Sequence, residues 1–354
     1  MRPIHSSTIK SRLIAILFLA FFPLILIAQE EGSCAEKLIT AQSLFDKGLV
    51  EQVPGMLQEC MKSGFNRDEY LSACKLLIQA LLFEDKLVQA DSAMMEFLSK
   101  NPEYEISVAD HSGFVHLFNT FDVKPVVQLS LHLGTNIPFL SLVNVKTTAS
   151  DNLVSSNNIS DPTNFFGSLE VKIPLSEKLE LNFETGYSQI SFTNIESVKG
   201  LYMGSKEINY EENQFRLEIP VSITYNYLKY RNFTGYGRLG AGASLRMSTN
   251  AKPLTNDINN PGSDTGAEFN RDDSRVFLDP IVQAGTGIKY KSPGGYAFME
   301  IRTNLGMLNQ TVRGGNSAQS LEWGYGYKDD DFHISVLNIN IGYTWIIYKP
   351  SKKR

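Results

Sequence analysis

The feature that most constrains this chain is a series of eight stretches, between residues 126 and 348, in which apolar and polar residues alternate. Within 214–228, for example, Phe215 and Leu217 alternate with Gln214 and Arg216. This period of two is typical of β-strands with one apolar face, and each stretch reaches about the nine to eleven residues with which a tilted strand crosses a bilayer. The stretches are 126–136, 164–175, 178–190, 214–228, 232–246, 276–290, 295–306 and 333–348.

The connections between these stretches alternate in length, which favours a membrane barrel over a soluble sheet protein. Short turns at 175–178, 229–231 and 291–294 alternate with long loops over roughly 137–163, 191–213, 247–275 and 307–332. Outer-membrane barrels have short periplasmic turns and long extracellular loops. The sequence therefore predicts an all-β transmembrane barrel of eight antiparallel strands over 125–354, with a soluble lipocalin-like barrel as the alternative.

Aromatic residues near the short turns agree with this orientation, because Trp and Tyr concentrate where a membrane meets water. We expect an interface belt at these ends of the strands. Its members are Tyr225, Tyr227, Tyr290, Tyr343, Trp345 and Tyr348.

Composition excludes several other classes of protein. The chain is 42% hydrophobic and 20% charged, which is too apolar for a disordered protein. A formal net charge of -5 gives no basic surface for nucleic acid. No apolar run of about 18 residues occurs beyond the amino-terminal segment, which excludes a helical membrane protein.

Residues 1–28 have the organisation of an export signal. Arg2, Lys10 and Arg12 precede the uncharged run 13–28, and Ala28 ends it as a small residue before the cleavage point. A signal anchor that stays attached is the alternative. Cys34 is not preceded by the small and apolar residues that a lipoprotein signal needs, so we do not expect a lipoprotein.

Between residues 29 and 110 the apolar residues recur with helical spacing instead. We expect helices at 34–47, 50–62, 67–83 and 87–99, and a connector at 111–124. Ala90, Met94, Phe97 and Pro102 stand at the spacing that marks the second helix of a tetratricopeptide repeat. The segment therefore resembles a small all-α domain of tetratricopeptide-like helical hairpins, although Cys74 stands where that repeat prefers a large aromatic residue.

Three cysteines in an exported chain allow one disulfide and one free thiol. If Cys34 opens the first helix and Cys60 closes the second, an antiparallel hairpin places the two side by side. We therefore predict a Cys34–Cys60 disulfide, with Cys60–Cys74 as the competing pair. Cys74 lies on an apolar stripe, so we expect it to be buried. The sequence contains no cysteine–histidine cluster of the kind that binds structural zinc.

The barrel segment also carries a family resemblance. The stretches Leu217–Val221, Gly235–Gly242 and Glu300–Arg302 resemble the PorT-like outer-membrane β-barrel family of the Bacteroidota, over about 230 residues. The helical segment resembles the periplasmic extension of some members. The resemblance implies the fold, and it implies for a few members a role in protein secretion or gliding, but it supplies no catalytic motif.

Charged residues stand at inward positions of the predicted strands, where an eight-stranded barrel leaves space only for side chains. We expect them to close the lumen as an ion-pair network, because buried charges must be paired; a proton or small-ion path is the alternative. They are Glu170, Lys172, Glu180, Glu184, Arg216, Glu218, Arg238, Lys289, Glu300 and Arg302.

No constellation predicts an enzyme. His132 and His333 are the histidines of the barrel segment, and Ser335 and Asp331 are near His333 only in number. Nucleophilic catalysis needs a serine and an acid that converge on the histidine. The run 329–331 of three aspartates lacks the spacing and glycine of an EF-hand, so we expect a solvated loop rather than a cation site.

Two hypotheses of function follow. In the first, a non-enzymatic outer-membrane barrel anchors the periplasmic helical domain, which docks envelope or secretion-machinery proteins. In the second, the loops bind a surface ligand or the lumen conducts a small solute, and the helical domain is a structural brace. Both place the chain in the outer membrane, in contact with lipid and lipopolysaccharide, and need no cofactor and no nucleic acid.

Overall fold

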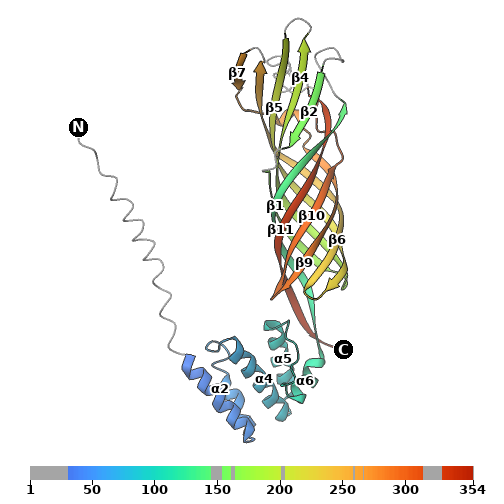
Figure 1. The fold of residues 1–354 in the computed structure, drawn as a ribbon. Helices are drawn as coiled ribbons and strands as arrows, with labels where there is room; N and C mark the ends of the chain where they lie inside the picture. Colours follow the sequence, from blue (N-terminus) through green and yellow to red (C-terminus); the bar gives the residue numbers. More distant parts are fainter. Residues whose placement is uncertain are drawn as a thin grey trace, which may run out of the picture. The chain divides into compact units, whose positions relative to one another are not determined.

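The computed structural model describes residues 31–144, 154–160, 164–200, 204–257, 260–265, 267–313 and 329–353. The chain forms two compact units. One comprises the residues up to Lys124 together with the segment from Lys349, and the other is Pro125–Tyr348 (Figure 1). The predicted export signal at 1–28 lies outside the described residues.

The first unit is called here the helical unit, and its described residues, from Glu31 on, form six helical segments. They are α2 (Glu31–Asp46), the 3-10 helix η2 (Val50–Gln52), α3 (Val53–Leu57), α4 (Arg67–Phe83), α5 (Leu87–Lys100) and α6 (Ser112–Asn119). Helix α4 starts at a capping box, in which the Asn66 side chain accepts from the Glu69 N–H and the Glu69 carboxylate accepts from the Asn66 N–H. The predicted helices at 34–47, 67–83 and 87–99 are present with shifts of a few residues.

Two predictions for this unit were wrong in detail. The predicted helix 50–62 is a 3-10 turn followed by the short α3, because Pro54 has no N–H to donate and Gly55 disfavours a longer helix. The predicted connector 111–124 contains α6, whose Phe114 and Leu117 are buried.

Helix α4 separates two apolar clusters in the helical unit. On one side Ala73, Leu76 and Ala80 meet residues of α2 and α3. On the other side lie residues from α4, α5 and α6 together with Phe121, which follows α6: Cys74, Ile78, Leu81, Ala90, Met94, Phe97, Leu98, Phe114, Leu117 and Phe121. The ring of Phe97 contacts Phe114 edge to face at 5.5 Å between centroids, so α6 is part of the second cluster.

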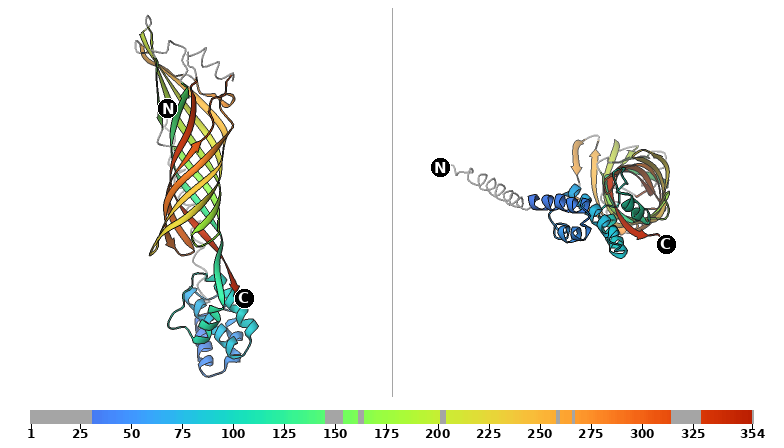
Figure 2. Two further views of the ribbon diagram at one scale, coloured as in Figure 1. Left: turned by 90° about the vertical axis from the view of Figure 1, so that its right-hand side faces the viewer. Right: turned by 90° about the horizontal axis from the view of Figure 1, so that it is seen from below.

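The second unit is a closed ring of eight antiparallel strands, the predicted fold class (Figure 2). The ring runs in the order β1, β3, β4, β5, β6, β9, β10, β11 and back to β1. Its strands are β1 (Phe121–Asn144), β3 (Asn164–Pro174), β4 (Leu179–Gly200), β5 (Gly204–Tyr230), β6 (Phe233–Asp257), β9 (Leu278–Ser292), β10 (Gly295–Gly306) and β11 (Asp331–Lys352). Outside the ring, β2 (Val154–Ser160) pairs with β4, while β7 (Asn260–Thr265) and β8 (Phe269–Asn270) pair with β6.

Several strands are much longer than predicted. Strands β4 and β5 remain paired out to Gly200 and Gly204, so most of the predicted loop 191–213 is a β-hairpin. Strand β5 has 27 residues, against the nine to eleven or so that cross a bilayer. The extra residues therefore extend beyond the thickness of a membrane, at the end opposite the tight turns.

The tight turns lie at the predicted places. Arg231 joins β5 to β6 with a φ of 51°, and Gly294 joins β9 to β10 with a φ of 75°. Positive φ values suit the twist of two-residue hairpin turns. Among the described residues, no helix is long and apolar enough to span a bilayer.

Candidate functional sites in the barrel lumen

The barrel buries mainly polar side chains and exposes mainly apolar ones, apart from a buried apolar cluster that includes Phe192 and Phe332. In β5, Arg216 and Glu218 are each 3% exposed, whereas Ile219 is 45% and Ile223 is 50% exposed. Water-soluble proteins have the opposite distribution. An outer surface of this kind fits lipid, and the polar interior must satisfy its own hydrogen bonds.

Arg238 of β6 is at the centre of the interior. Its Nη1 lies 2.7 Å from Glu170 Oε1 and 3.3 Å from Glu184 Oε2, and its Nε lies 3.2 Å from Glu300 Oε2. These carboxylates come from β3, β4 and β10. One guanidinium therefore connects strands from different sides of the ring.

Arg302 adds a second cation to this central cluster. Its two terminal nitrogens each lie 2.7 Å from an oxygen of Glu184, a bidentate pair. On the far side of Glu170, Lys172 Nζ lies 3.1 Å and His132 Nε2 lies 2.9 Å from Oε2. His132 was not predicted as part of the network, although its inward position in 126–136 could have indicated it.

The remaining predicted lumen residues lie apart from the central cluster. Lys289 Nζ pairs with Glu180 at 2.7 Å. Glu218 accepts from Asn304 Nδ2 at 2.7 Å, and Arg216 is 3.8 Å from Asp279, an acid that the sequence analysis missed. The ten predicted residues thus share one lumen but form four groups.

A further charged cluster, which the sequence analysis also missed, lies where the long connections meet the barrel. Arg275 reaches Glu212 at 2.6 Å and Asp329 at 3.2 Å, and Arg271 reaches the same two carboxylates. Arg271 and Arg275 come from the segment before β9, and Asp329 comes from the segment before β11. Burial alone would raise the pKa of Asp329, but Arg275 and Arg271 lower it to about 2.

The solvated loop expected at 329–331 was wrong, because Asp330 and Asp331 are 4% and 5% exposed, and the three aspartates do not share one set of partners. Asp329 faces the two arginines, while Asp331 accepts from Asn309 Nδ2 at 3.0 Å. No group of three or more metal-ligating side chains occurs in the described part of the chain. His333 and Ser335 stand on the partly exposed face of β11, two residues apart, and the structure adds no serine–histidine–acid convergence to what the sequence showed.

The predicted interface aromatics lie near the tight turns. Tyr290 is 47% exposed and contacts Phe233 at 5.0 Å between ring centroids. Trp345 is 51% exposed and contacts Tyr343 at 5.0 Å, and the Tyr343 hydroxyl donates to the Pro293 carbonyl. Tyr225 and Tyr227 are also exposed, at the end of β5 that leads into the Arg231 turn, and Tyr348 is half-buried.

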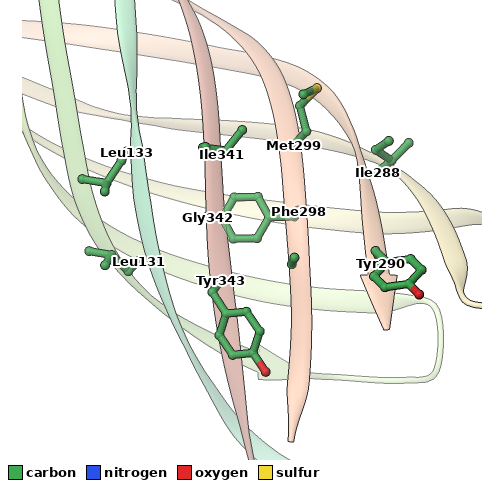
Figure 3. A pocket seen from close by; sticks show the side chains of 10 residues that line it. Leu131, Leu133, Ile288, Tyr290, Phe298, Met299, Ile341, Gly342 and Tyr343 are labelled. Atoms are coloured by element: carbon green, nitrogen blue, oxygen red, sulfur yellow. The ribbon is translucent and has the colours of Figure 1, made fainter. Parts of the chain in front are cut away.

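A shallow apolar groove of about 540 Å³ runs along the outer face of β1, β11, β10 and β9 (Figure 3). Leu131, Leu133, Ile341 and Met299 line its walls. Below it, the Phe298 ring occupies the space that a side chain at Gly342 would fill. The groove contains almost no polar surface and therefore has no means to orient a polar substrate.

The helical unit contains the Cys34–Cys60 disulfide, with 5.7 Å between the Cα atoms. Cys74 is a buried free thiol. Burial raises the pKa of the Cys74 thiol to about 11, so it is not a nucleophile at neutral pH.

Comparison with known proteins identifies no family. No protein-family model matches the chain, and no curated protein matches it. Solved structures that align include Neisserial surface protein A (11% identity, 63% of this chain and 98% of the other, TM-score 0.29). The outer membrane protease OmpT from Escherichia coli aligns with 12% identity over 64% and 98% of the two chains, with a TM-score of 0.34. OprG from Pseudomonas aeruginosa aligns with 15% identity over 62% and 97%, with a TM-score of 0.32. These values are too low to transfer a function or a site residue.

Proposed function

We propose that this chain is an outer-membrane β-barrel protein whose barrel is a closed anchor, and whose helical unit docks a protein of the cell envelope in the periplasm. The observation that carries the proposal is the pairing of charges across the lumen. Arg238 alone contacts carboxylates from three other strands, and all four side chains are at most 2% exposed. An eight-stranded barrel has just enough interior for such side chains, so conduction is not its proposed role.

The proposed orientation of the protein in the membrane follows from the two ends of the barrel. Outer-membrane barrels place short turns and both chain ends on the periplasmic side. Arg231 and Gly294 mark tight turns at the end where the exposed aromatics gather, and β1, the first strand of the ring, begins in the last residues before Lys124 that belong to the helical unit. The helical unit is therefore periplasmic in this proposal.

Docking is assigned to the helical unit because this unit exposes large apolar side chains. Phe83, Leu87 and Val88, at the turn between α4 and α5, are 61%, 56% and 80% exposed. Exposed apolar groups that adjoin one another mark surfaces for protein partners. The tetratricopeptide-like and PorT-like resemblances agree with this role and belong to the same proposal, which includes no catalytic step.

The test is site-specific photo-crosslinking in intact cells. A photoreactive amino acid replaces Val88 in one version and the exposed Glu51, away from the α4–α5 turn, in the control. The docking role requires a discrete light-dependent adduct from position 88 and none from position 51. Absence of any adduct at 88, or equal adducts at both positions, would refute docking.

A second measurement tests the anchor role. The purified protein is inserted into planar lipid bilayers, and its ionic current is compared with that of an Arg238→Ser variant. The closed-lumen reasoning expects no steady conductance from the wild type. A stable ion current through the unmodified protein would favour the conducting alternative instead.

A further inference from the structure

A pocket of about 440 Å³ in the helical unit has a chemistry that the apolar turn at Val88 does not share. Its walls are the segment after α3, the first turns of α4 and the end of α5. The lining residues are Cys60, Met61, Lys62, Ser63, Gly64, Phe65, Asn66, Arg67, Tyr70, Lys100 and Asn101.

The charge of this pocket is opposite to that of the unit that contains it. Residues 31–124 include fifteen acidic and eight basic side chains. Three of the basic ones, Lys62, Arg67 and Lys100, line the pocket, and no acidic side chain does. A concentration of one sign inside a concave surface attracts ligands of the other sign.

These cations are available to a ligand. Lys62 and Arg67 are exposed and form no ion pair within the described residues. Lys100 pairs with Glu96 at 2.9 Å on its own helix, where both side chains are more than half exposed to water. Water screens such an exposed pair, which contributes little to stability, so a ligand carboxylate can replace Glu96 at little cost.

Apolar surface lies beside the cations. Met61, Phe65 and Tyr70 line the same pocket and are only partly buried. Lys100 Nζ lies 4.8 Å from the centre of the Tyr70 ring. The pocket therefore offers contacts for carboxylates and for an apolar side chain together, which an inorganic anion would use only in part.

The wall formed by residues 60–66 is held in place by covalent and steric constraints. Cys60 is bonded to Cys34 of α2. Gly64 has a φ of 133°, and a Cβ at this position would lie 2.7 Å from Cys34 Sγ, so the loop packs directly on the disulfide. A preorganised wall lowers the entropy cost of binding.

We propose that this pocket binds an acidic, partly apolar peptide segment, whose carboxylates pair with Lys62, Arg67 and Lys100 while an apolar side chain packs on Phe65 and Tyr70. The inference rests on the docking role of the helical unit, and it names the chemistry of the partner. The apolar wall is the reason to favour a peptide over phosphate.

The test uses the full-length protein in detergent and a fluorescent peptide that alternates Glu and Asp with Phe. Fluorescence anisotropy measures its affinity for the wild type and for Lys62→Glu, Arg67→Glu and Lys47→Glu. Lys47 is an exposed lysine that does not line the pocket, so it controls for net charge. We expect the two pocket variants to weaken binding by roughly tenfold each, and the control to change it less than about twofold.

Three results would overturn the inference: no binding of the acidic peptide, equal binding of a peptide with Gln and Asn in place of Glu and Asp, or an equal loss in Lys47→Glu. Inorganic phosphate, added at the same concentration of negative charge as the peptide, should not displace it. Displacement would identify a small-anion site and would also overturn the inference. The crosslink at position 88 separates the two proposals. If that adduct persists in the pocket variants and the peptide does not bind, the docking role stands and this inference fails.

Discussion

Loss of the Cys34–Cys60 disulfide should lower the free energy of unfolding of the helical unit. The size of the loss depends on the number of residues between the two cysteines. The bond spans 26 residues. Loop closure over that length lowers the entropy of the unfolded chain by about 12 cal/mol/K, or about 3.5 kcal/mol at room temperature. With a urea dependence of about 1.5 kcal/mol/M for a unit of this size, the unfolding midpoint should fall by about 2 M.

The assay is urea titration of the full-length Cys34→Ser/Cys60→Ser variant in detergent, followed by circular dichroism at 222 nm. Among the described residues, the barrel unit contains strands and only one three-residue 3-10 helix, so this signal reports mainly the helical unit. Cys74→Ala is a control that removes a cysteine without opening the loop. A midpoint shift below about 0.5 M in the double variant would refute the loop-closure reasoning, because it would correspond to less than about 1 kcal/mol.

Three other predictions concern buried polar groups. Burial alone would raise the pKa of Asp110, but hydrogen bonds from Tyr104, the Ser107 N–H and Lys75 lower it. Asp110→Asn should therefore lower the free energy of unfolding by about 1–2 kcal/mol at pH 7. In urea titrations the difference between the two proteins should shrink as pH falls through the lowered pKa of Asp110. A difference that stays constant with pH would contradict the assignment. Burial raises the Cys74 pKa to about 11, so at pH 7.5 mass spectrometry should find maleimide on Cys74 only after unfolding, and rapid labelling of the native protein would be the contrary result. Arg238→Met leaves three lumen carboxylates without their shared cation and should destabilise the barrel by about 3–5 kcal/mol in lipid-vesicle urea titrations; an unchanged midpoint would mean that the pairing contributes nothing.

The sequence predicted the number and order of the ring strands because a barrel wall has two chemically different faces. Lipid on one side and paired polar groups on the other impose a period of two on every strand. Strand length was underestimated, since the sequence of residues 191–200 and 204–213 has no regular alternation of apolar and polar residues, although the two segments pair. Backbone hydrogen bonds hold these segments together, and such bonds do not require a particular type of side chain.

Contacts that depend on ring closure were harder to predict. The alternation of inward and outward positions along each strand predicted that ten charged residues face the lumen. It could not predict which of them would pair, because partners such as Arg238 and Glu170 lie on strands that are not neighbours in the ring. The connections that contain Arg271, Arg275 and Asp329 show no periodic pattern of apolar residues. The sequence therefore could not predict that these residues cluster with Glu212. Helix α6 was missed because its apolar residues, Phe114 to Phe118, are too few to establish a helical period.

The segment that follows the barrel has a consequence for how the protein is assembled. Lys353 donates its N–H to the Thr120 carbonyl at 2.7 Å, and Lys352 pairs with Asp91 of α5, so the helical unit includes residues synthesised after the whole ring. Strand β11 also pairs with β1 to close the barrel. The same stretch of chain thus completes both units, and neither reaches its final form on a polypeptide that stalls or is cut before β11. An incomplete chain therefore has an open sheet edge and an unfinished helical unit at the same time.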